Sequence, residues 1–419
     1  MAISSNTIWR VRIGGLDTNG GAFDPSIAGA GTDYTDQDTA QLSLTDLATA
    51  GVSASVTSAT GGFTSAMIGN AIYIASGTNF TAGTYFVVAV ASSNAATLDR
   101  NCCTAAASGG VVKLGGAHAS ISRCSSVGAA AGNTVMVRGQ GSNEPVDIDY
   151  YTSTYWSGQS SLRYIGYNGR PKISHSGILF YNVSYCSLEN FYFIQTSAGY
   201  TNQGVLVSST ACLAVNCVFD QGGFDSTQVT YSACINCTFI NTGTQVAGTR
   251  HAIVLGAGGG YGQSILSCHI KDIRGPGINL IVSRGATVLN TIIQNCGSDG
   301  INITTASGVN TLAVSGCTLY GNAGHGITID GTTHVVKDCL ITNHTTSGKY
   351  GLYYSVTPAG YGRYIAPLQH SNAFYGNNAD CNYALASDDL VANPQFVNAP
   401  TDLTPTNTAM RYLAGVGAS

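Results

Sequence analysis

Two short alternating runs stand within the stretch Cys317-Thr-Leu-Tyr-Gly-Asn-Ala-Gly-His-Gly-Ile-Thr-Ile329. In each run, apolar residues alternate with small or polar ones. A period of two marks a β-strand, because successive side chains point to opposite faces. Gly and Asn residues separate the two runs, and both are typical of tight turns. The stretch therefore predicts two short strands joined by a turn.

This pattern recurs between about residues 180 and 380. Each copy of the first run has a small residue, a variable residue, a large apolar residue and then a polar turn residue. The copies begin, at intervals of 20 to 33 residues, at Cys217, Cys237, Cys268, Thr291, Cys317, Cys339 and Asn372. A second strand follows most copies and begins at Gly277, Gly300, Gly326 and Gly351. The pattern is that of a repeat protein.

A repeat of this length cannot bury its apolar face alone, so neighbouring repeats must stack into a parallel solenoid. Equivalent residues of successive repeats then lie about 4.8 Å apart. One inward ladder is expected to consist of the reduced thiols of Cys217, Cys237, Cys268, Cys317 and Cys339, and a second to run from Phe219 to Phe374. Asn241, Asn295 and Asn343 are expected in the turns, where Asn tolerates a left-handed backbone.

The repeat, Cys-x-Ile-x-x-Asn followed by Gly-Ile-x-Ile, resembles the right-handed parallel β-helix proteins of the pectate-lyase-like superfamily over about residues 110 to 400. The segment from Leu390 to Asn398 resembles the closing segment of such helices. The stretch from Thr57 to Arg100 is similar to a small β-domain that precedes the helix in many bacteriophage members. The resemblance implies a virion appendage such as a tailspike.

An all-β chain follows from these observations, with a right-handed parallel β-helix preceded by a small N-terminal β-domain. The expected parts are an N-terminal segment at 1–50 with a short helix over Thr39 to Ala50, the small β-domain at 51–105, the β-helix at 106–395 and a C-terminal cap at 396–419. The solenoid is expected to have about eleven rungs and a length of about 50 Å. The cap is expected to cover its last rung.

Composition narrows the range of functions. The 419 residues include 17 Lys and Arg against 21 Asp and Glu, and charged residues make up only 9% of the chain. This excludes a nucleic-acid binder that relies on a basic surface. No window reaches the ~18 consecutive apolar residues of a membrane span. We therefore expect neither a nucleic-acid partner nor insertion into a membrane.

The 13 Cys residues mostly stand singly within strand-like stretches. This placement indicates buried free thiols rather than a disulfide framework, and hence assembly in a reducing compartment such as the host cytoplasm. No paired Cys spacing typical of a zinc site occurs. We therefore expect no metal and no cofactor.

Alignment of the Gly-Ile strands brings the residues just before them into one column, namely His251, Pro276, Asp299, His325 and Tyr350. Asp299 and His325 would then lie one rung apart, within reach of a direct hydrogen bond. An Asp that fixes a His tautomer is how a general base is oriented. The alternative is a column of turn residues that only satisfy one another's hydrogen bonds.

The outward positions of these strands are Asn279, Asn302, Thr328 and Tyr353. Amides, a hydroxyl and an aromatic face suit sugar rings, which present hydroxyl groups at their edge and C–H groups on their face. Together with His251 and Tyr350, these residues form the predicted carbohydrate-binding set. A polar face exposed to solvent is the alternative.

Cleavage of a glycosidic bond usually requires two carboxyl groups about 5 to 9.5 Å apart. Asp299 and Asp330 flank the Gly-Ile strands at opposite ends, which separates them by more than roughly 15 Å. Asp147 and Asp149 alternate onto one face of a strand, about 6.5 to 7 Å apart. These two form the best pair within one chain, although they equally suit an exposed strand or a subunit contact. The catalytic candidates are thus Asp299, His325, Asp147 and Asp149.

We expect a tailspike-like appendage of a phage virion, a homotrimer that contacts other virion proteins and recognises a polysaccharide of the host surface. Tyr150, Tyr151, Tyr155 and Trp156 cluster where subunits would meet. Two alternatives stay open, a structural capsid or tail decoration protein and a polysaccharide-cleaving hydrolase or lyase. The missing carboxylate pair beside the sugar-suited residues favours binding over catalysis.

Overall fold

The computed structural model divides into two compact units, which we describe separately. Unit 1 comprises Met1–Tyr150, Gln159–Ile173 and Cys186–Phe191, and unit 2 comprises Tyr151–Gly158, Ser174–Tyr185 and Tyr192–Ser419. The structure describes residues 4–139, 147–151, 161–175, 180–181, 183–195, 206–207, 210–221, 223–226, 231–241, 251–255, 260–281, 283–303, 311–330, 334–355 and 368–407.

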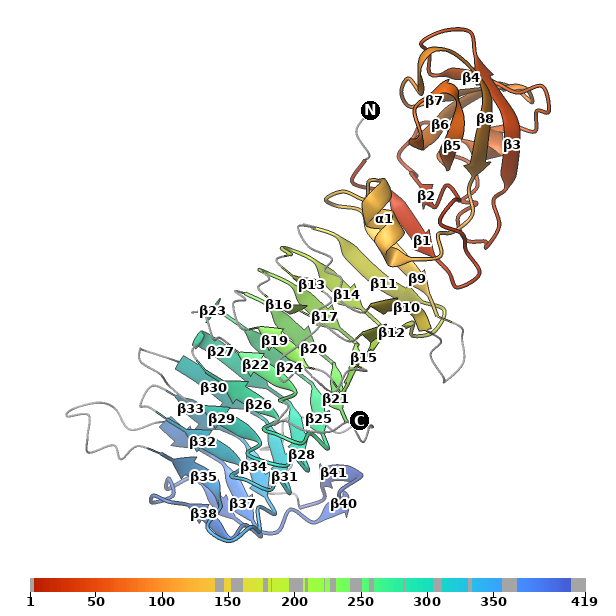
Figure 1. Ribbon diagram of the computed structural model, residues 1–419. Helices are drawn as coiled ribbons and strands as arrows, with labels where there is room; N and C mark the ends of the chain where they lie inside the picture. Colours follow the sequence, from red (N-terminus) through yellow and green to blue (C-terminus); the bar gives the residue numbers. More distant parts are fainter. Residues whose placement is uncertain are drawn as a thin grey trace. The chain divides into compact units, whose positions relative to one another are not determined.

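Unit 1 contains a closed barrel of six strands (Figure 1). Around the barrel the strands are β3 (Leu42–Thr49), β4 (Ser55–Thr57), β7 (Ala95–Leu98), β6 (Gly83–Ser92), β5 (Ala71–Phe80) and β8 (Cys103–Leu114), and a short 3-10 helix, η1, spans Ser65–Met67. Leu47, Ile72 and Ile74 are fully buried in its core. Closure leaves no unpaired strand edge in the barrel. The small β-domain thus extends beyond the predicted 51–105 at both ends.

The predicted helix over Thr39 to Ala50 is wrong, because this segment forms strand β3, paired antiparallel with β8. Leu44 and Leu47 both point into the barrel core. The register of the pair shifts between these two residues, which marks an irregularity of the β-bulge kind. A bulge inserts an extra residue. Because of the bulge, two buried leucines of one strand are three residues apart, a spacing that is typical of a helix.

The N-terminal segment also supplies a strand to the rungs of unit 1. Strand β1 (Ile8–Val11) pairs in parallel with β9 (Thr134–Arg138), followed by β11 (Arg163–Tyr167) and β14 (Ser187–Glu189), while β2 (Ala22–Phe23) pairs antiparallel with β1 and helix α1 spans Ile121–Val127. Trp9 of β1 is fully buried, and its indole N–H donates a hydrogen bond to Asn133 at 3.0 Å. Strand β1 therefore covers the edge of the rung that starts at β9.

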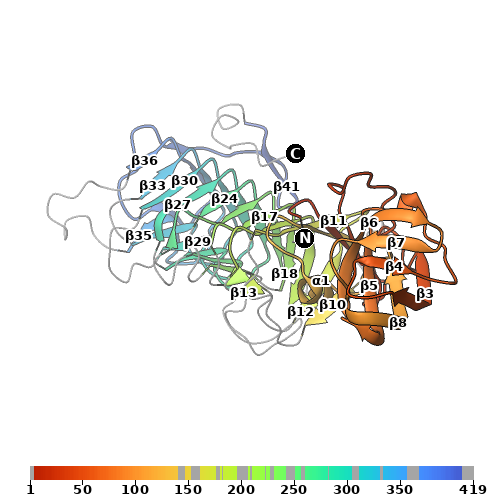
Figure 2. The same cartoon turned by 90° about the horizontal axis from the view of Figure 1, so that it is seen from above.

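Unit 2 is a stack of rungs, each with short strands that pair in parallel with the same strands of the next rung (Figure 1 and Figure 2). The first sheet has the order β17 (Leu213–Val215), β20 (Ala233–Ile235), β24 (Ser264–Leu266), β27 (Ser283–Leu289), β30 (Thr311–Ser315), β33 (Val335–Lys337) and β36 (Leu368–His370). The second has the order β15 (Tyr192–Gln195), β18 (Val218–Asp220), β21 (Thr238–Ile240), β25 (His269–Lys271), β28 (Ile292–Gln294), β31 (Thr318–Tyr320), β34 (Leu340–Thr342), β37 (Ala373–Tyr375) and β39 (Leu390–Val391).

The third sheet of unit 2 carries the predicted Gly-Ile strands. Its order is β19 (Phe224–Ser226), β22 (Ile253–Leu255), β26 (Ile278–Leu280), β29 (Ile301–Ile303), β32 (Ile327–Ile329), β35 (Tyr350–Tyr354) and β38 (Ala379–Cys381). The remaining strands are β10 (Asp147–Tyr151), β12 (Lys172–His175), β13 (Phe180–Tyr181), β16 (Leu206–Val207), β23 (Gly260–Tyr261), β40 (Phe396–Asn398) and β41 (Asp402–Pro405).

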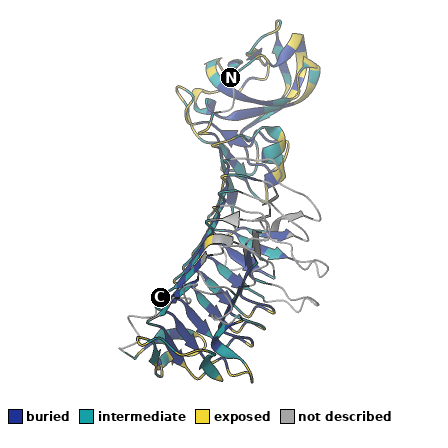
Figure 3. Ribbon diagram, turned by 90° about the vertical axis from the view of Figure 1, so that its left-hand side faces the viewer, coloured by how far each residue is buried: buried dark blue, intermediate teal, exposed yellow. Residues whose placement is uncertain are grey.

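The two predicted inward ladders are confirmed. Phe219 pairs in register with Phe239, and their rings stack with centroids 4.8 Å apart and planes 8° from parallel. The ladder continues through Ile270, Ile293, Leu319 and Ile341 to Phe374. The five aligned cysteines, Cys217, Cys237, Cys268, Cys317 and Cys339, are all free and buried. In Figure 3, dark blue buried segments recur from rung to rung of unit 2.

Single residues in the left-handed conformation turn the chain at the corners of the rungs. Asn216 and Asn236 occupy one corner with φ of 53° and 52°, and the Asn236 amide donates to the Asn216 side chain at 2.6 Å. Asn295 and Asn343 occupy the next corner with φ of 53° and 63°, as predicted. Asn tolerates this conformation better than most residues, which explains its recurrence.

The closing segment packs along the flank of the rungs. Strand β39 pairs with β37, and β40 and β41 then form an antiparallel pair. Phe396 of β40 meets the ring of Tyr320 edge-on at 5.6 Å and packs near Leu340 and Ala373. The predicted cap therefore lies, as far as residue 407, against the side of earlier rungs rather than across the last one.

Thiol accessibility tests the ladder. Of the 13 free cysteines, twelve are buried and Cys381 is partly exposed. Titration of the native protein with a thiol reagent should therefore label about one thiol per chain, while the denatured chain should give all 13. Cys381→Ser should abolish the native signal. Disulfides found by mass mapping, or several thiols reactive in the native state, would contradict this core.

Candidate functional site

The third sheet of unit 2 brings its rungs close together at a column of glycines. A Cβ atom added at Gly300 would lie 2.7 Å from the carbonyl oxygen of Gly326, and one added at Gly326 would lie 2.4 Å from that of Gly351. Neither separation is tolerated by a real Cβ atom. Glycine is therefore required where each Gly-Ile strand begins, and the residues beside it are held one rung apart.

The register of this sheet confirms the predicted column. Ile253, Ile278, Ile301, Ile327 and Leu352 pair in succession. The residues two positions earlier therefore follow one another rung by rung, and these are His251, Pro276, Asp299, His325 and Tyr350. Sequence spacing alone was sufficient to align them.

Asp299 contacts the next rung through both carboxylate oxygens. One accepts the backbone N–H of His325 at 2.8 Å, and the other accepts the hydroxyl of Thr328 at 2.6 Å. A Cβ atom added at Gly324 would lie 2.1 Å from the same carboxylate, which explains the glycine before His325. Asp299 thus bonds the backbone of His325 and not its imidazole. The Asp-oriented His that a general base would require is not formed here.

His325 is nearly buried, with 8% of its surface exposed, and belongs to a stack of rings. Its Nδ1 accepts the backbone N–H of Tyr350 at 3.0 Å. The imidazole lies 4.3 Å from the ring of Tyr353 and 5.8 Å from that of Tyr350, nearly parallel to both. Burial lowers the pKa of His325, and this effect outweighs the opposing attraction of Asp299. At neutral pH the imidazole is therefore neutral, with its proton on Nε2.

The four outward positions also align in register, from Asn279 through Asn302 and Thr328 to Tyr353. The amide of Asn302 donates to the side chain of Asn279 at 3.0 Å. Asn279 and Thr328 are only 8% and 9% exposed, while Asn302 and Tyr353 are half-buried. The alternative of a polar face fully exposed to solvent therefore does not fit these four positions. We call the seven residues Asn279, Asn302, Thr328, Tyr353, Asp299, His325 and Tyr350 the polar strip.

The polar strip offers recognition groups more readily than reactive ones. Both oxygens of Asp299 already accept hydrogen bonds, so this carboxylate positions Thr328 and the backbone of His325. The neutral imidazole supplies a donor at Nε2, and Asn302 supplies amide groups. Tyr353 is half-buried, because its ring stacks on His325 at 4.3 Å and lies 5.5 Å from the ring of Tyr350, and the exposed part of the ring supplies an apolar surface. These groups are of the kinds that suit sugar hydroxyls and C–H faces.

Other predicted residues do not join the strip. His251 lies one rung before Pro276, and its Nδ1 finds no hydrogen-bond partner among the described residues. Burial lowers its pKa. Asp147 and Asp149 lie on strand β10, as their alternation predicted, but their side chains fall outside the description. Tyr155 and Trp156 also lie outside the described residues.

The described residues contain no group of three or more His, Cys, Asp and Glu side chains arranged to hold a metal ion. No helix among them is long and apolar enough to cross a membrane.

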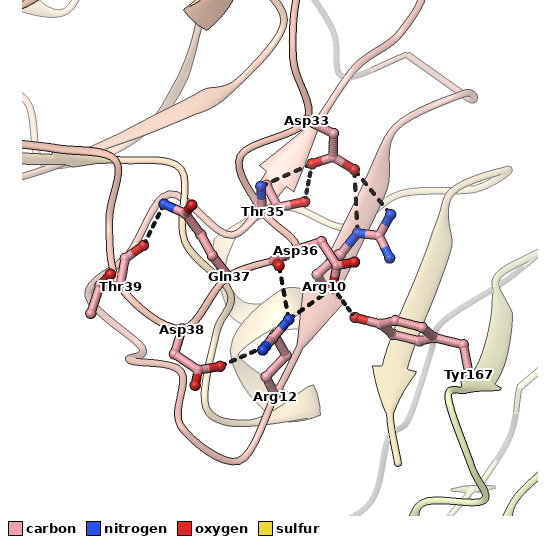
Figure 4. Close-up of polar contacts among 9 residues, drawn as sticks. All are labelled: Arg10, Arg12, Asp33, Thr35, Asp36, Gln37, Asp38, Thr39 and Tyr167. Atoms are coloured by element: carbon pink, nitrogen blue, oxygen red, sulfur yellow. Dashed lines mark hydrogen bonds and ion pairs between the residues drawn. The ribbon is translucent and has the colours of Figure 1, made fainter. Parts of the chain in front are cut away.

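A cluster of ion pairs in unit 1 was not among the predicted sites (Figure 4). Its pairs are Arg10–Asp33 at 3.0 Å, Arg12–Asp36 at 3.0 Å and Arg12–Asp38 at 2.5 Å. The Tyr167 hydroxyl donates to Asp36 at 2.6 Å, and burial raises the pKa of Tyr167 to about 12. Arg12 and Asp38 also line a cavity of about 200 Å³. The arginines and aspartates of the cluster thus pair with one another, and these ion pairs connect the 33–38 loop to β1 and the residue after it.

Comparison with known proteins agrees with this architecture. Residues 176–346 match a family model described as a right handed beta helix region. The chain carries a right-handed parallel β-helix. No curated protein matches its sequence.

Solved structures with a similar course of the chain include three carbohydrate-related proteins. A GH136 lacto-N-biosidase from Eubacterium ramulus matches over 66% of this chain and 64% of its own, with 9% identity and a TM-score of 0.44. A mannuronic acid specific polysaccharide family 6 lyase from human gut microbiota matches over 64% and 79%, with 13% identity and a TM-score of 0.36. A mutant tailspike protein of E. coli bacteriophage HK620, in complex with a pentasaccharide, matches over 63% and 55%, with 11% identity and a TM-score of 0.30.

A column of buried polar residues lies behind the polar strip, just after the second corner of each rung. Asn322 donates to the carbonyl of Ile293, and Asn377 donates to that of Ile341. His344 stands between these two asparagines in the column, and its Nδ1–H donates to the carbonyl of Asn322 at 3.3 Å. His344 is fully buried, and burial lowers its pKa to about 4.

His344 should make unit 2 sensitive to acid. In the unfolded chain this imidazole takes a proton near pH 6.5, but in the folded chain only near pH 4, so between these values protons favour unfolding. The cost is about 1.4 kcal/mol per pH unit, or up to about 3 kcal/mol in all. His344→Asn, which copies its column neighbours, should fold and should flatten the fall in Tm between pH 6.5 and 4. An unchanged pH dependence in the variant would contradict the assignment.

Proposed function

We propose that the chain is a tailspike-like appendage of a phage virion, and that its β-helix binds a polysaccharide of the host surface as part of a homotrimer. The observation that carries this proposal is the polar strip. It places a partly open tyrosine ring beside neutral hydrogen-bonding groups, all fixed by contacts between rungs. The virion location and the trimer rest on the resemblance of the sequence to phage appendages.

The order of groups along the strip suits a glycan that runs across successive rungs. Tyr353 offers its face to the C–H groups of one sugar, while Thr328 and the Nε2–H of His325 lie one rung away for hydroxyl groups. Asn302 follows after one more rung. Rungs repeat every ~4.8 Å, which places a new polar group at each step along an extended chain. Because these side chains are held before the ligand arrives, little conformational entropy is lost on binding.

Hydrolysis would require a different arrangement of acids. A pair of carboxyl groups is the usual requirement, one to protonate the leaving oxygen and one to act as base or nucleophile. Within the polar strip Asp299 is the one acid, and its oxygens are engaged by His325 and Thr328. The strip therefore favours binding over cleavage.

Binding should depend on the aromatic face of Tyr353. We expect the wild-type protein to bind at least one polysaccharide in an array of purified bacterial O-antigens and capsular polysaccharides. Tyr353→Ala should weaken that binding about 5- to 10-fold, since a stacked aromatic face contributes about 1 kcal/mol. Tyr353→Phe should retain most of the affinity because it keeps the ring.

Tyr375→Ala serves as the matched control, since Tyr375 is 41% exposed on another sheet of the solenoid. It should bind like wild type. Equal affinity of wild type and Tyr353→Ala would overturn the assignment of the strip. The same incubations are assayed for new reducing ends and unsaturated products. Steady release of oligosaccharides that Asp299→Asn abolishes would replace the binding proposal with an enzymatic one.

A further inference from the structure

Two tyrosines of unit 2 stand far out of the solenoid on one edge. Tyr185 and Tyr231 are each 66% exposed, more than the other large hydrophobic side chains among the described residues. Both have left-handed backbones, with φ of 56° and 55°. In its rung, each tyrosine forms the corner two positions before the strand of the first sheet. Ala211 and Gly262 occupy the same corner in other rungs. We call Tyr185, Ala211 and Tyr231 the tyrosine edge.

Local stability does not account for aromatic residues at this corner. A bulky side chain is strained in the left-handed region, whereas Asn and Gly adopt it easily. At the corner that follows the first sheet, the solenoid uses Asn216 and Asn236 in the same left-handed conformation. The tyrosine side chains also bury little surface in return, because each is 66% exposed. Strained residues that gain little from packing are found preferentially at functional sites.

The spacing of the two rings is fixed by the rungs. Ser184 bridges to Thr210, which places Tyr185 beside Ala211 on the next rung. Leu213 pairs with Ala233, which places Ala211 beside Tyr231 on the rung after that. Tyr185 and Tyr231 therefore stand two rungs apart, or about 9.6 Å. The methyl side chain of Ala211 leaves the space between the rings open. This distance is close to the length of one disaccharide in an extended polysaccharide.

Tyr231 lies beside the next rung along one edge of its ring. A Cβ atom added at Gly262 would lie 2.8 Å from Cδ1 and 3.1 Å from Cε1 of Tyr231, so only a glycine fits beside this edge. The side chain is otherwise mostly open to solvent. An exposed aromatic face is what sugar rings stack on.

The surrounding sequence has almost no charge. Residues 173–249 contain no Lys and no Arg, and their acids are Glu189, Asp220 and Asp225. One exposed cation, Arg163, pairs with Ser187 on the rung before the tyrosine edge. A nucleic acid or an acidic glycan would require cations on this surface. The stretch around the tyrosine edge therefore suits an uncharged ligand.

We propose that the tyrosine edge is a second carbohydrate-binding site, on which a neutral polysaccharide lies along the solenoid and stacks alternate sugar residues on Tyr185 and Tyr231. The site shares with the proposed function the premise that the solenoid binds glycans, but it has no residue in common with the polar strip. It binds an extended neutral chain by its spacing rather than by hydrogen bonds to particular sugars.

Affinity electrophoresis tests this site with hydroxyethylcellulose, galactomannan and dextran as neutral probes. At least one probe should retard the wild-type protein. Tyr185→Asn and Tyr231→Asn should each weaken retardation about 5-fold, and the double variant should abolish it. Because Asn suits the left-handed backbone, the Tm of each variant should equal or exceed that of wild type. Tyr375→Ala, an exposed tyrosine elsewhere, should behave like wild type.

Three results would overturn the site. One is that none of the three probes retards the wild-type protein, and another is that the double variant is retarded as strongly as wild type. The third is a changed mass of the double variant in sedimentation, which would assign the tyrosines to a subunit contact. Tyr353→Ala, run in the same gels, distinguishes the two sites. Retardation that is lost in Tyr353→Ala but kept in the Tyr185 and Tyr231 variants supports the polar strip alone. Retardation that is kept in Tyr353→Ala but lost in those variants supports the tyrosine edge alone.

Discussion

The structure depends on one constraint, the in-register stacking of each rung on the next. Parallel pairing places every side chain about 4.8 Å from its equivalent. Like residues therefore meet like, as in the stacked rings of Phe219 and Phe239 and the amide contact of Asn236 with Asn216. At the glycine column a Cβ atom would collide with the backbone of the following rung, so register and close approach are set together.

The same constraint shapes the two proposed binding surfaces. Asp299 reaches the next rung to hold Thr328 and the backbone of His325, and His325 in turn accepts from Tyr350 one rung further on. The polar strip is thus ordered by contacts between rungs and not by a flexible loop. At the tyrosine edge, rung spacing sets the distance between two aromatic side chains without any contact between them. Both surfaces present groups at fixed intervals, which suits a ligand that is itself a repeating chain.

The sequence predicted what depends on period and failed where local geometry decides. Recurrence every 20 to 33 residues was enough to align the cysteine ladder and the column from His251 to Tyr350. The repeat spacing did not predict that Asp299 accepts a hydrogen bond from the backbone of His325, because spacing aligns residues but does not show which of their atoms are in contact. The bulge in β3 disguised a strand as a helix. Tyr185 and Tyr231 were missed because no residue spacing reveals a left-handed backbone, although both stand just before the first strand of their rungs.

The central claim is that a glycan lies on the polar strip of the β-helix. Its most direct test is a crystal structure of the protein with an oligosaccharide prepared from a polysaccharide that the protein binds. We predict sugar density beside Tyr353, with a hydroxyl group at hydrogen-bond distance from Nε2 of His325 and further contacts at Thr328 and Asn302. Well-defined sugar density elsewhere, with the polar strip empty at saturating ligand, would contradict the account.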